Sequence, residues 1–95
     1  MAVFLVTWDL NKEKPNYSAA RDKVIAALSK CTHAKDSGLD SVWFVDTTSS
    51  IHEIYDYLAP NFDSNDRLVI THMKKGDYHG WLSTPAWTWI NARSL

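Results

Sequence analysis

The sequence is poor in the residue types on which several common functional motifs depend. It has one cysteine, Cys31, and only three glycines and three prolines among its 95 residues. A single cysteine cannot form an internal disulfide, and its place on the apolar side of a predicted helix favours inert packing over catalysis. Three well-separated glycines cannot build a phosphate-binding loop or a dinucleotide-binding fingerprint. We therefore expect neither a disulfide-stabilised fold nor a nucleotide-binding enzyme of these classes.

Two further features are weak or absent. The chain has no signal-peptide pattern and no apolar run long enough to cross a bilayer. Its net charge is only −1, whereas proteins that bind duplex DNA strongly and nonspecifically are usually basic, because phosphate contacts supply most of their affinity. We therefore expect a cytoplasmic protein with no membrane partner, whose monomer does not bind duplex DNA strongly.

Apolar and aromatic bulk is what the sequence has in plenty. Ninety-five residues make one domain, spanning 1–95, and a domain of this size leaves much of its surface in water. Yet the chain is 45% hydrophobic and 13% aromatic, with five tryptophans. This is more apolar material than one small core readily buries, and it favours a subunit interface.

The charges are unevenly distributed along the chain. The first third is mostly basic, whereas every charged residue from Asp36 to Asp66 is acidic. Such a separation can build a basic face on a nearly neutral protein. The alternative, which we favour, is two solvated surfaces of opposite sign.

The first ten residues carry the most informative local pattern. Apolar residues occupy both faces of a predicted strand from Ala2 to Trp8, with Val3, Leu5 and Thr7 on one side and Phe4, Val6 and Trp8 on the other. Apolar residues on both sides are typical of a strand buried on two faces. Asp9 follows directly, where that burial should end. A carboxylate at a strand end can hold a metal ion or a structural partner.

The remaining pattern predicts alternating helices and strands. Asn16 is a candidate cap for a helix from about Tyr17 to Cys31, and Ser50 and Glu53 form a capping box that opens a second helix. The other expected elements are a weak strand at 32–35, a better strand at 41–47, a two-sided strand at 67–73, a short extra strand at 77–82 and a last helix from Thr84.

This order of elements predicts an α+β fold of the ferredoxin-like βαββαβ type, with an antiparallel sheet plus a short C-terminal strand and helix. Helices cover one face of such a sheet. The apolar residues of the other face need cover elsewhere, which predicts a homodimer. The last helix is too short to be stable alone. It must dock on its own sheet or on that of a partner.

Asp9 has two interpretations. As a ligand it would offer oxygen to a hard cation such as Mg²⁺, which takes one or two carboxylates and keeps several waters. One aspartate per chain is a poor site, but two brought together by a dimer axis are a reasonable one. Alternatively, Asp9 pairs with Arg21 or accepts hydrogen bonds near the start of the first helix. The two interpretations are compatible, since Arg21 could tune a metal-bound carboxylate.

Other candidate chemistry is less specific. The four histidines and Cys31 show no zinc-ligand spacing, although His79 in the tail could carry a proton. Ser41 lacks the flanking sequence of a nucleophile elbow. The tryptophans could stack on bases, but packing in the core or an interface is favoured because the strands are apolar on both sides.

Several short motifs resemble one known family. They are the strand Val3 to Asp9, the helix segment Arg21, Lys23 and Val24, the strand Ser41-Val42-Trp43-Phe44, and the late strand from Asp66 to Met73 that follows an acidic turn. Residues 1–73 thereby resemble the small CRISPR-associated adaptation subunit, the Cas-two family, and its stand-alone relatives, the virulence-associated protein D ribonucleases and SinR-family proteins. The tail from Asp77, rich in tryptophan, looks more like the SinR relatives. We therefore favour a stand-alone relative.

The resemblance implies a ferredoxin-like homodimer that associates with RNA or DNA. Some members of the family are metal-dependent endonucleases whose strand-ending aspartates face each other across the dimer axis, and others are DNA-binding scaffolds. Carried across, Asp9 becomes the expected catalytic residue and Mg²⁺ ligand, and Arg21 and Lys23 become expected nucleic-acid contacts. The leading hypothesis is therefore a homodimeric nucleic-acid-associated protein with divalent-metal endonuclease activity. The alternatives are a non-catalytic dimeric adaptor and a small-ligand sensor, since this fold hosts many functions.

Overall fold

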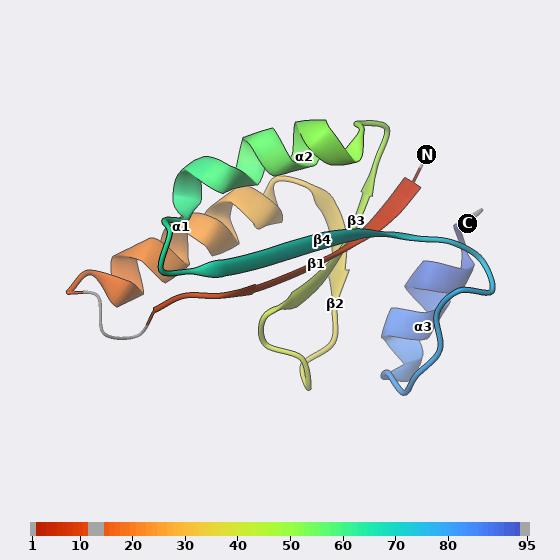
Figure 1. Ribbon diagram of the computed structural model, residues 1–95. Coiled ribbons are helices and arrows are strands. Elements are labelled where there is room, and N and C mark those ends of the chain that lie inside the picture. The colour runs from red at the N-terminus through yellow and green to blue at the C-terminus, as the bar shows by residue number, and fades with distance from the viewer. Residues whose placement is uncertain (1, 12–14, 94–95) are drawn as a thin grey trace.

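A computed structural model of the chain describes residues 2–11 and 15–93 (Figure 1). The elements in chain order are β1 (Ala2–Asp9), α1 (Tyr17–Ser29), β2 (Thr32–Lys35), β3 (Val42–Thr47), α2 (Ile51–Leu58), the short 3₁₀ helix η1 (Ala59–Asn61), β4 (Arg67–Met73) and α3 (Thr84–Asn91). Across these described residues, none of the helices has the length and apolar character needed to span a membrane.

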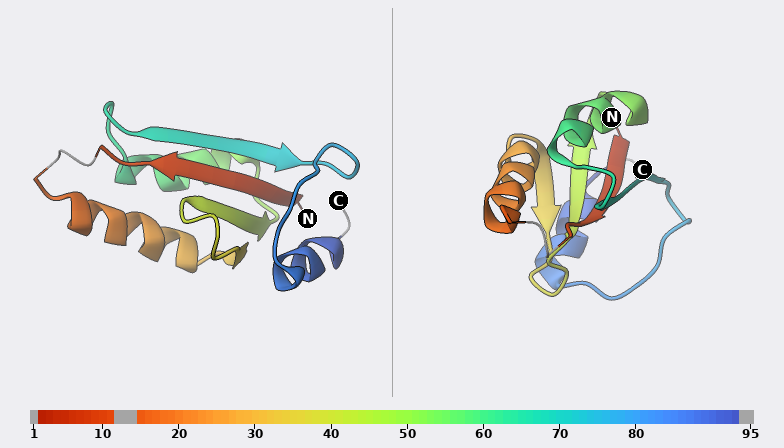
Figure 2. Two further views of the ribbon diagram at one scale, coloured as in Figure 1. Left: turned by 90° about the horizontal axis from the view of Figure 1, so that it is seen from below. Right: turned by 60° about the vertical axis from the view of Figure 1, so that its left-hand side comes forward.

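The four strands form one antiparallel sheet in the order β2-β3-β1-β4. This arrangement confirms the predicted ferredoxin-like α+β fold. The central strand β1 pairs with β3 on one side and β4 on the other, so that Leu5 lies between Phe44 and Thr71. Helices α1 and α2 lie together on one side of the sheet, and α3 lies on the other (Figures 1 and 2).

The larger core lies between the sheet and the helices α1 and α2. Phe4, Val6 and Trp8 of β1 point into it, as their alternation predicts, and they pack with Val24 and Leu28 of α1. The remaining buried members are Leu10, Ala20, Trp43, Val45, Ile54 and Leu58. This core fixes α1 and α2 on one face and leaves the opposite residues of β1 pointing away from them.

The predicted helix starts are correct, but they are capped in different ways. At α2 both bonds of the capping box are present, because Ser50 Oγ accepts from the Glu53 N–H and Glu53 Oε1 accepts from the Ser50 N–H. At α1, Asn16 occupies the cap position without a side-chain bond, and its carbonyl oxygen accepts from the Ala20 N–H at 2.9 Å. The sequence therefore located both helix starts, although α1 ends at Ser29 and not at Cys31, and only the cap bond of α2 is as expected.

The face of the sheet opposite α1 and α2, here called the open face, is partly covered by the chain's own C-terminal segment. Ile90 of α3 is fully buried against Val3, Phe44 and Met73 in a second, smaller core. The sequence left open whether this helix docks on its own sheet or on a partner's. In the structure it docks on its own sheet, which reduces the apolar area that a second copy would have to cover.

The prediction of an extra strand at 77–82 is wrong. Between β4 and α3 the described chain contains no strand, and the segment 74–83 is a loop that crosses toward α3 (Figure 2). A turn directs it away from β4, since the Asp77 N–H donates to the Lys74 carbonyl oxygen and Gly76 has a φ of +87°. Such a positive φ favours glycine and ends the extended strand. Tyr78 and Leu82 instead pack on the second core.

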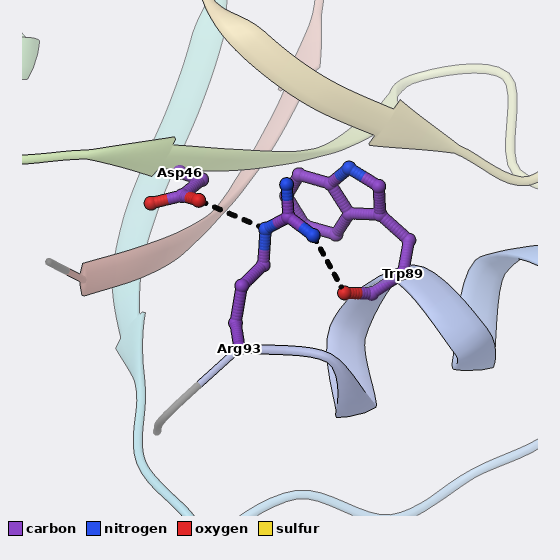
Figure 3. A network of polar contacts seen from close by, with 3 residues as sticks. All are labelled: Asp46, Trp89 and Arg93. Carbon is purple, nitrogen blue, oxygen red and sulfur yellow. Dashed lines mark hydrogen bonds and ion pairs between the residues drawn. The ribbon is translucent and has the colours of Figure 1, made fainter.

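Two carboxylates, Asp46 on β3 and Asp36 directly after β2, hold the ends of α3. Near the C-terminal end, Arg93 Nε donates to Asp46 Oδ2 at 2.8 Å, and Arg93 Nη1 donates to the Trp89 carbonyl oxygen at 3.0 Å (Figure 3). The guanidinium also lies 3.6 Å from the centre of the Trp89 ring. At the other end, the Ser83 N–H donates to Asp36 Oδ2 at 2.6 Å. Polar bonds thus reinforce apolar packing at both ends.

Arg93→Met should destabilise the fold, because it leaves the buried Asp46 carboxylate, whose side chain is only 4% exposed, without its cation. We expect a loss of about 1–3 kcal/mol in the free energy of unfolding, measured by urea denaturation. The double variant Asp46→Asn with Arg93→Met should regain part of that loss, since no buried charge remains. Equal losses in the single and double variants would contradict the ion-pair explanation.

Candidate functional site

Asp9 lies at the end of β1 on the open face. It shares that face with Val3, Leu5 and Thr7, because alternate residues of a strand point to the same side. Its side chain is exposed, and the next residue, Leu10, returns to the buried core. The structure therefore places the carboxylate at the end of the central strand, where the sequence pattern predicts that burial ends.

Arg67 is the residue directly opposite Asp9, since the two are cross-strand partners in the β1–β4 register. Arg67 is also exposed, and its Nη1 donates to the Asp66 carbonyl oxygen at 3.0 Å. Opposite charges across an antiparallel pair contribute about 0.2–1 kcal/mol. Sequence reasoning missed Arg67. The signal was available, since the ferredoxin-like order places the start of β4 beside the end of β1.

The buried carboxylate of Asp66 fixes the backbone around this pair. Its Oδ1 accepts from the Asn11 N–H at 2.9 Å, and its Oδ2 accepts from the Asp63 N–H at 3.0 Å. These bonds join the segment that follows β1 to the turn that precedes β4. Asp66 therefore has a structural task, and it holds the positions of Asp9 and Arg67 relative to each other.

Arg21 and Lys23, the expected nucleic-acid contacts, lie on α1 and so on the other layer of the molecule. Arg21 is half-buried and Lys23 is exposed. Arg21 lies near Lys35, whose pKa is lowered by burial and, to a smaller extent, by the positive charge of Arg21, against the opposing effect of Asp40. Among the described residues no hydrogen bond or ion pair joins Arg21 to Asp9. The structure does not bring the basic pair and the aspartate onto one face.

Metal binding by Asp9 rests on the chemistry of one carboxylate per chain. Within residues 2–11 and 15–93, no three or more histidine, cysteine, aspartate or glutamate side chains are grouped so as to hold a metal ion. The exposed carboxylate of Asp9 offers the hard oxygen donor that Mg²⁺ prefers. One chain supplies only this carboxylate at Asp9. The Mg²⁺ site therefore remains a prediction that depends on a second copy.

An apolar groove opens on the same face as Asp9, between the sheet, the loop 74–83 and α3. Its volume is about 250 Å³, and the residues around it are Leu5, Leu39, Val42, Phe44, Met73, Tyr78, His79, Gly80, Trp81, Leu82 and Trp87. Trp81 contributes to its rim but is itself 97% exposed. Sequence reasoning missed this groove because it assigned Trp81 to a strand, whereas an exposed loop holds it.

Cys31 lies two residues beyond the end of α1, so the prediction that it belongs to the apolar side of this helix is wrong. It is half-buried, its thiol lies 3.8 Å from the Ala27 carbonyl oxygen, to which it donates, and burial raises the pKa of the thiol. A raised pKa lowers the fraction of thiolate, which is the nucleophilic form. Burial therefore disfavours the nucleophilic form of this thiol, which lines a cleft at the ends of α1 and β3.

The histidines contact aromatic side chains and backbone. His33 Nδ1 donates a 2.8 Å hydrogen bond to the Cys31 carbonyl oxygen, and its ring lies 4.7 Å from that of Trp43. Because a carbonyl oxygen only accepts, the bonded Nδ1 carries the proton. His72 lies 5.3 Å from the ring of Phe4. His79, the histidine that the sequence left as a candidate proton carrier, is exposed beside the apolar groove.

Comparison with models of known protein families gives no match, and comparison with curated protein sequences gives none either. The resemblance to the Cas-two family therefore stays a prediction based on the short motifs named above. The function has to be argued from the residues of the site.

Asp36, which binds the backbone at the start of α3, is a titratable group whose pKa the fold lowers. Two backbone N–H groups hold its pKa below the ordinary value, first that of Ser83 and then that of Gly38. A carboxylate with a lowered pKa in the folded state stabilises the fold at pH values above its unfolded pKa of about 3.9. That stabilisation is lost as the pH falls through the folded-state pKa.

Asp36→Asn should therefore be less stable than the wild type at neutral pH, and its stability should fall less steeply in acid. The measurement is the urea midpoint over a pH series from about 7 down to about 2.5, which spans the ordinary aspartate pKa. Asp56→Asn, at an exposed position of α2, is the matched control. Equal acid slopes for the wild type and Asp36→Asn would show that the bonds to Ser83 and Gly38 do not carry this effect.

Proposed function

We propose that the protein is a homodimeric nucleic-acid-associated protein in which two copies of Asp9 bind Mg²⁺ and support endonuclease activity. The observation that carries the proposal is the position of Asp9, exposed at the end of the central strand and on the incompletely covered face of the sheet. Two copies that meet through this face can bring their Asp9 side chains together. The short motifs shared with the Cas-two family support the same assignment.

The incompletely covered face supports the dimer. Val69 of β4 points to this face beside Thr7 and is 58% exposed, and Leu5 is only half-buried. Most closed dimers have two-fold symmetry, so that the same patch of each copy meets its counterpart and a residue near the axis meets itself. Asp9 follows Thr7 by two residues on the same face, which suits it to a place near such an axis.

The surrounding charges suit a phosphodiester substrate. Two carboxylates, one from each copy, are a donor set suited to Mg²⁺, which retains several waters. When bound, the ion would polarise a phosphate and lower the pKa of its water. Arg67, opposite Asp9, can bind a phosphate with two parallel N–H groups. Arg21 and Lys23 would contact more distant phosphates from the helical layer.

A non-catalytic dimeric adaptor is the second candidate, and the apolar groove favours it. The groove and Trp81 lie on the open face without Asp9 among the lining residues. In this candidate the open face binds protein, and Asp9 serves as the cross-strand partner of Arg67. The two candidates differ in what Asp9 does, and a substitution there separates them.

Asp9→Ala should abolish nucleic-acid cleavage if Asp9 is a metal ligand. The assay incubates pure protein with RNA and with DNA in Mg²⁺ or in EDTA, and we expect cleavage only with Mg²⁺. Loss of a residue that merely supports a ligand lowers metal affinity or activity about 10–100-fold, so loss of the ligand itself should cost at least about 100-fold. Asp56→Ala, an exposed aspartate on α2, is the control and should retain activity.

The results also decide between the two candidates. Cleavage that persists in Asp9→Ala would contradict the proposed mechanism. If the wild type does not cleave either substrate, and Asp9→Ala lowers the melting temperature by no more than a few degrees, as expected for the loss of an exposed cross-strand pair, the adaptor candidate is favoured.

A further inference from the structure

Trp81 is exposed in a way that a single chain does not explain. All five tryptophans lie among the described residues; Trp8 and Trp43 are buried, Trp87 and Trp89 are half-buried, and Trp81 is 97% exposed. An aromatic side chain of this size buries 150–250 Å² when it packs, so leaving it in water forgoes a large gain. The exposed Trp81 therefore points to a contact outside its own chain.

The groove beside Trp81 has the size and the apolar lining suited to one aromatic side chain. Its volume of about 250 Å³ is below the range of about 300–1,000 Å³ that is usual for small-molecule sites. Aromatic and aliphatic side chains line it, among them Phe44 of β3 and Trp87 of α3. Trp81 does not fill the groove of its own chain, since nearly all of its side chain is in water.

The open face leaves further apolar side chains in water beside Trp81. Val69 of β4, which points to this face beside Thr7, is 58% exposed, and Leu39 beside the groove is 38% exposed. Together with Trp81 these side chains offer an apolar surface on which a second copy can pack.

We propose that Trp81 of each copy inserts into the apolar groove of the other. This inference rests on the proposed homodimer and specifies its contact. A two-fold interface joins the same patch to itself, so the patch must carry both a projection and a matching hollow. The open face carries both, as Trp81 and the groove beside it. The net charge of −1 adds little repulsion between two copies.

The reciprocal insertion would place each Trp81 in a central, water-excluded pocket. Tryptophans in such positions carry most of the binding energy of many interfaces. Leu39, which is 38% exposed on the groove wall, would also lose its contact with water. Because each dimer contains the contact twice, a substitution of Trp81 removes two insertions.

The test measures the monomer–dimer equilibrium of the full chain by sedimentation equilibrium. Trp81→Ala should raise the dissociation constant of the dimer by about 100-fold or more, the scale of a lost hot-spot residue. Tyr55→Ala removes another exposed aromatic, 54% exposed on α2, and should leave the constant unchanged. Leu39→Asp introduces a charge on the groove wall and should weaken the dimer while Trp81 remains in place.

Acrylamide quenching of tryptophan fluorescence gives an independent readout. In the wild type, the accessible fraction of the emission should fall as the protein concentration rises through the dimer range, because Trp81 becomes enclosed. In Trp81→Ala the accessible emission, which then comes from the half-buried Trp87 and Trp89, should be lower than in the wild-type monomer and should not change with concentration. Since Trp81 is exposed in the single chain, its removal leaves the fold intact, and circular dichroism of each variant verifies this.

Each outcome decides the inference. A wild-type dimer that both Trp81→Ala and Leu39→Asp dissociate supports it. A wild-type dimer that persists unchanged in both variants overturns the insertion of Trp81 and leaves the proposed nuclease dimer standing. A wild type that is monomeric at all concentrations overturns the insertion and the proposed function together. Weakening by Trp81→Ala and by Tyr55→Ala to the same degree would also overturn it.

Discussion

The central strand β1 is apolar on both faces, and this single constraint determines how the rest of the chain is arranged. Phe4, Val6 and Trp8 require one cover, which α1 and α2 provide. Val3 and Leu5 require another on the opposite side. Among the described residues, α3 and the loop before it provide this second cover, and it is incomplete. The exposed Asp9, the apolar groove and Trp81 all lie where the second cover ends.

The incomplete cover is nevertheless held firmly. Asp36 binds the backbone at the start of α3, and Asp46 binds Arg93 at its end. Hydrogen bonds to a charged group are roughly twice as strong as neutral ones, and their directions fix the helix at one position on the sheet. The loop 74–83 is thereby held between β4 and a fixed helix. Trp81 therefore projects from a defined place beside the groove.

Alternation and helix signals in the sequence were sufficient for the βαββαβ core. The two faces of β1 and the Ser50–Glu53 capping box were read from local patterns, because both depend on neighbouring residues. The docking of α3 depends on distant partners, and a short amphipathic helix fits its own sheet or a partner's equally well. The loop 77–82 resembled a strand because residue alternation does not report the turn at Gly76. Arg67 was missed because cross-strand partners follow from register, which emerges only from the assembled sheet.

If two copies meet through the open face, their Asp9 positions lie close together, and the distance between them can be measured directly. The variant is Asp9→Cys with Cys31→Ala, which removes the native thiol, and it carries a spin label at residue 9. Pulsed electron–electron double resonance then reports the distance between the labels of the two copies. Two copies that share one cation at Asp9 should give one short, narrow distance between the two labels. A dimer with widely separated labels would contradict the shared-cation arrangement, and the absence of any dipolar signal would contradict the dimer itself.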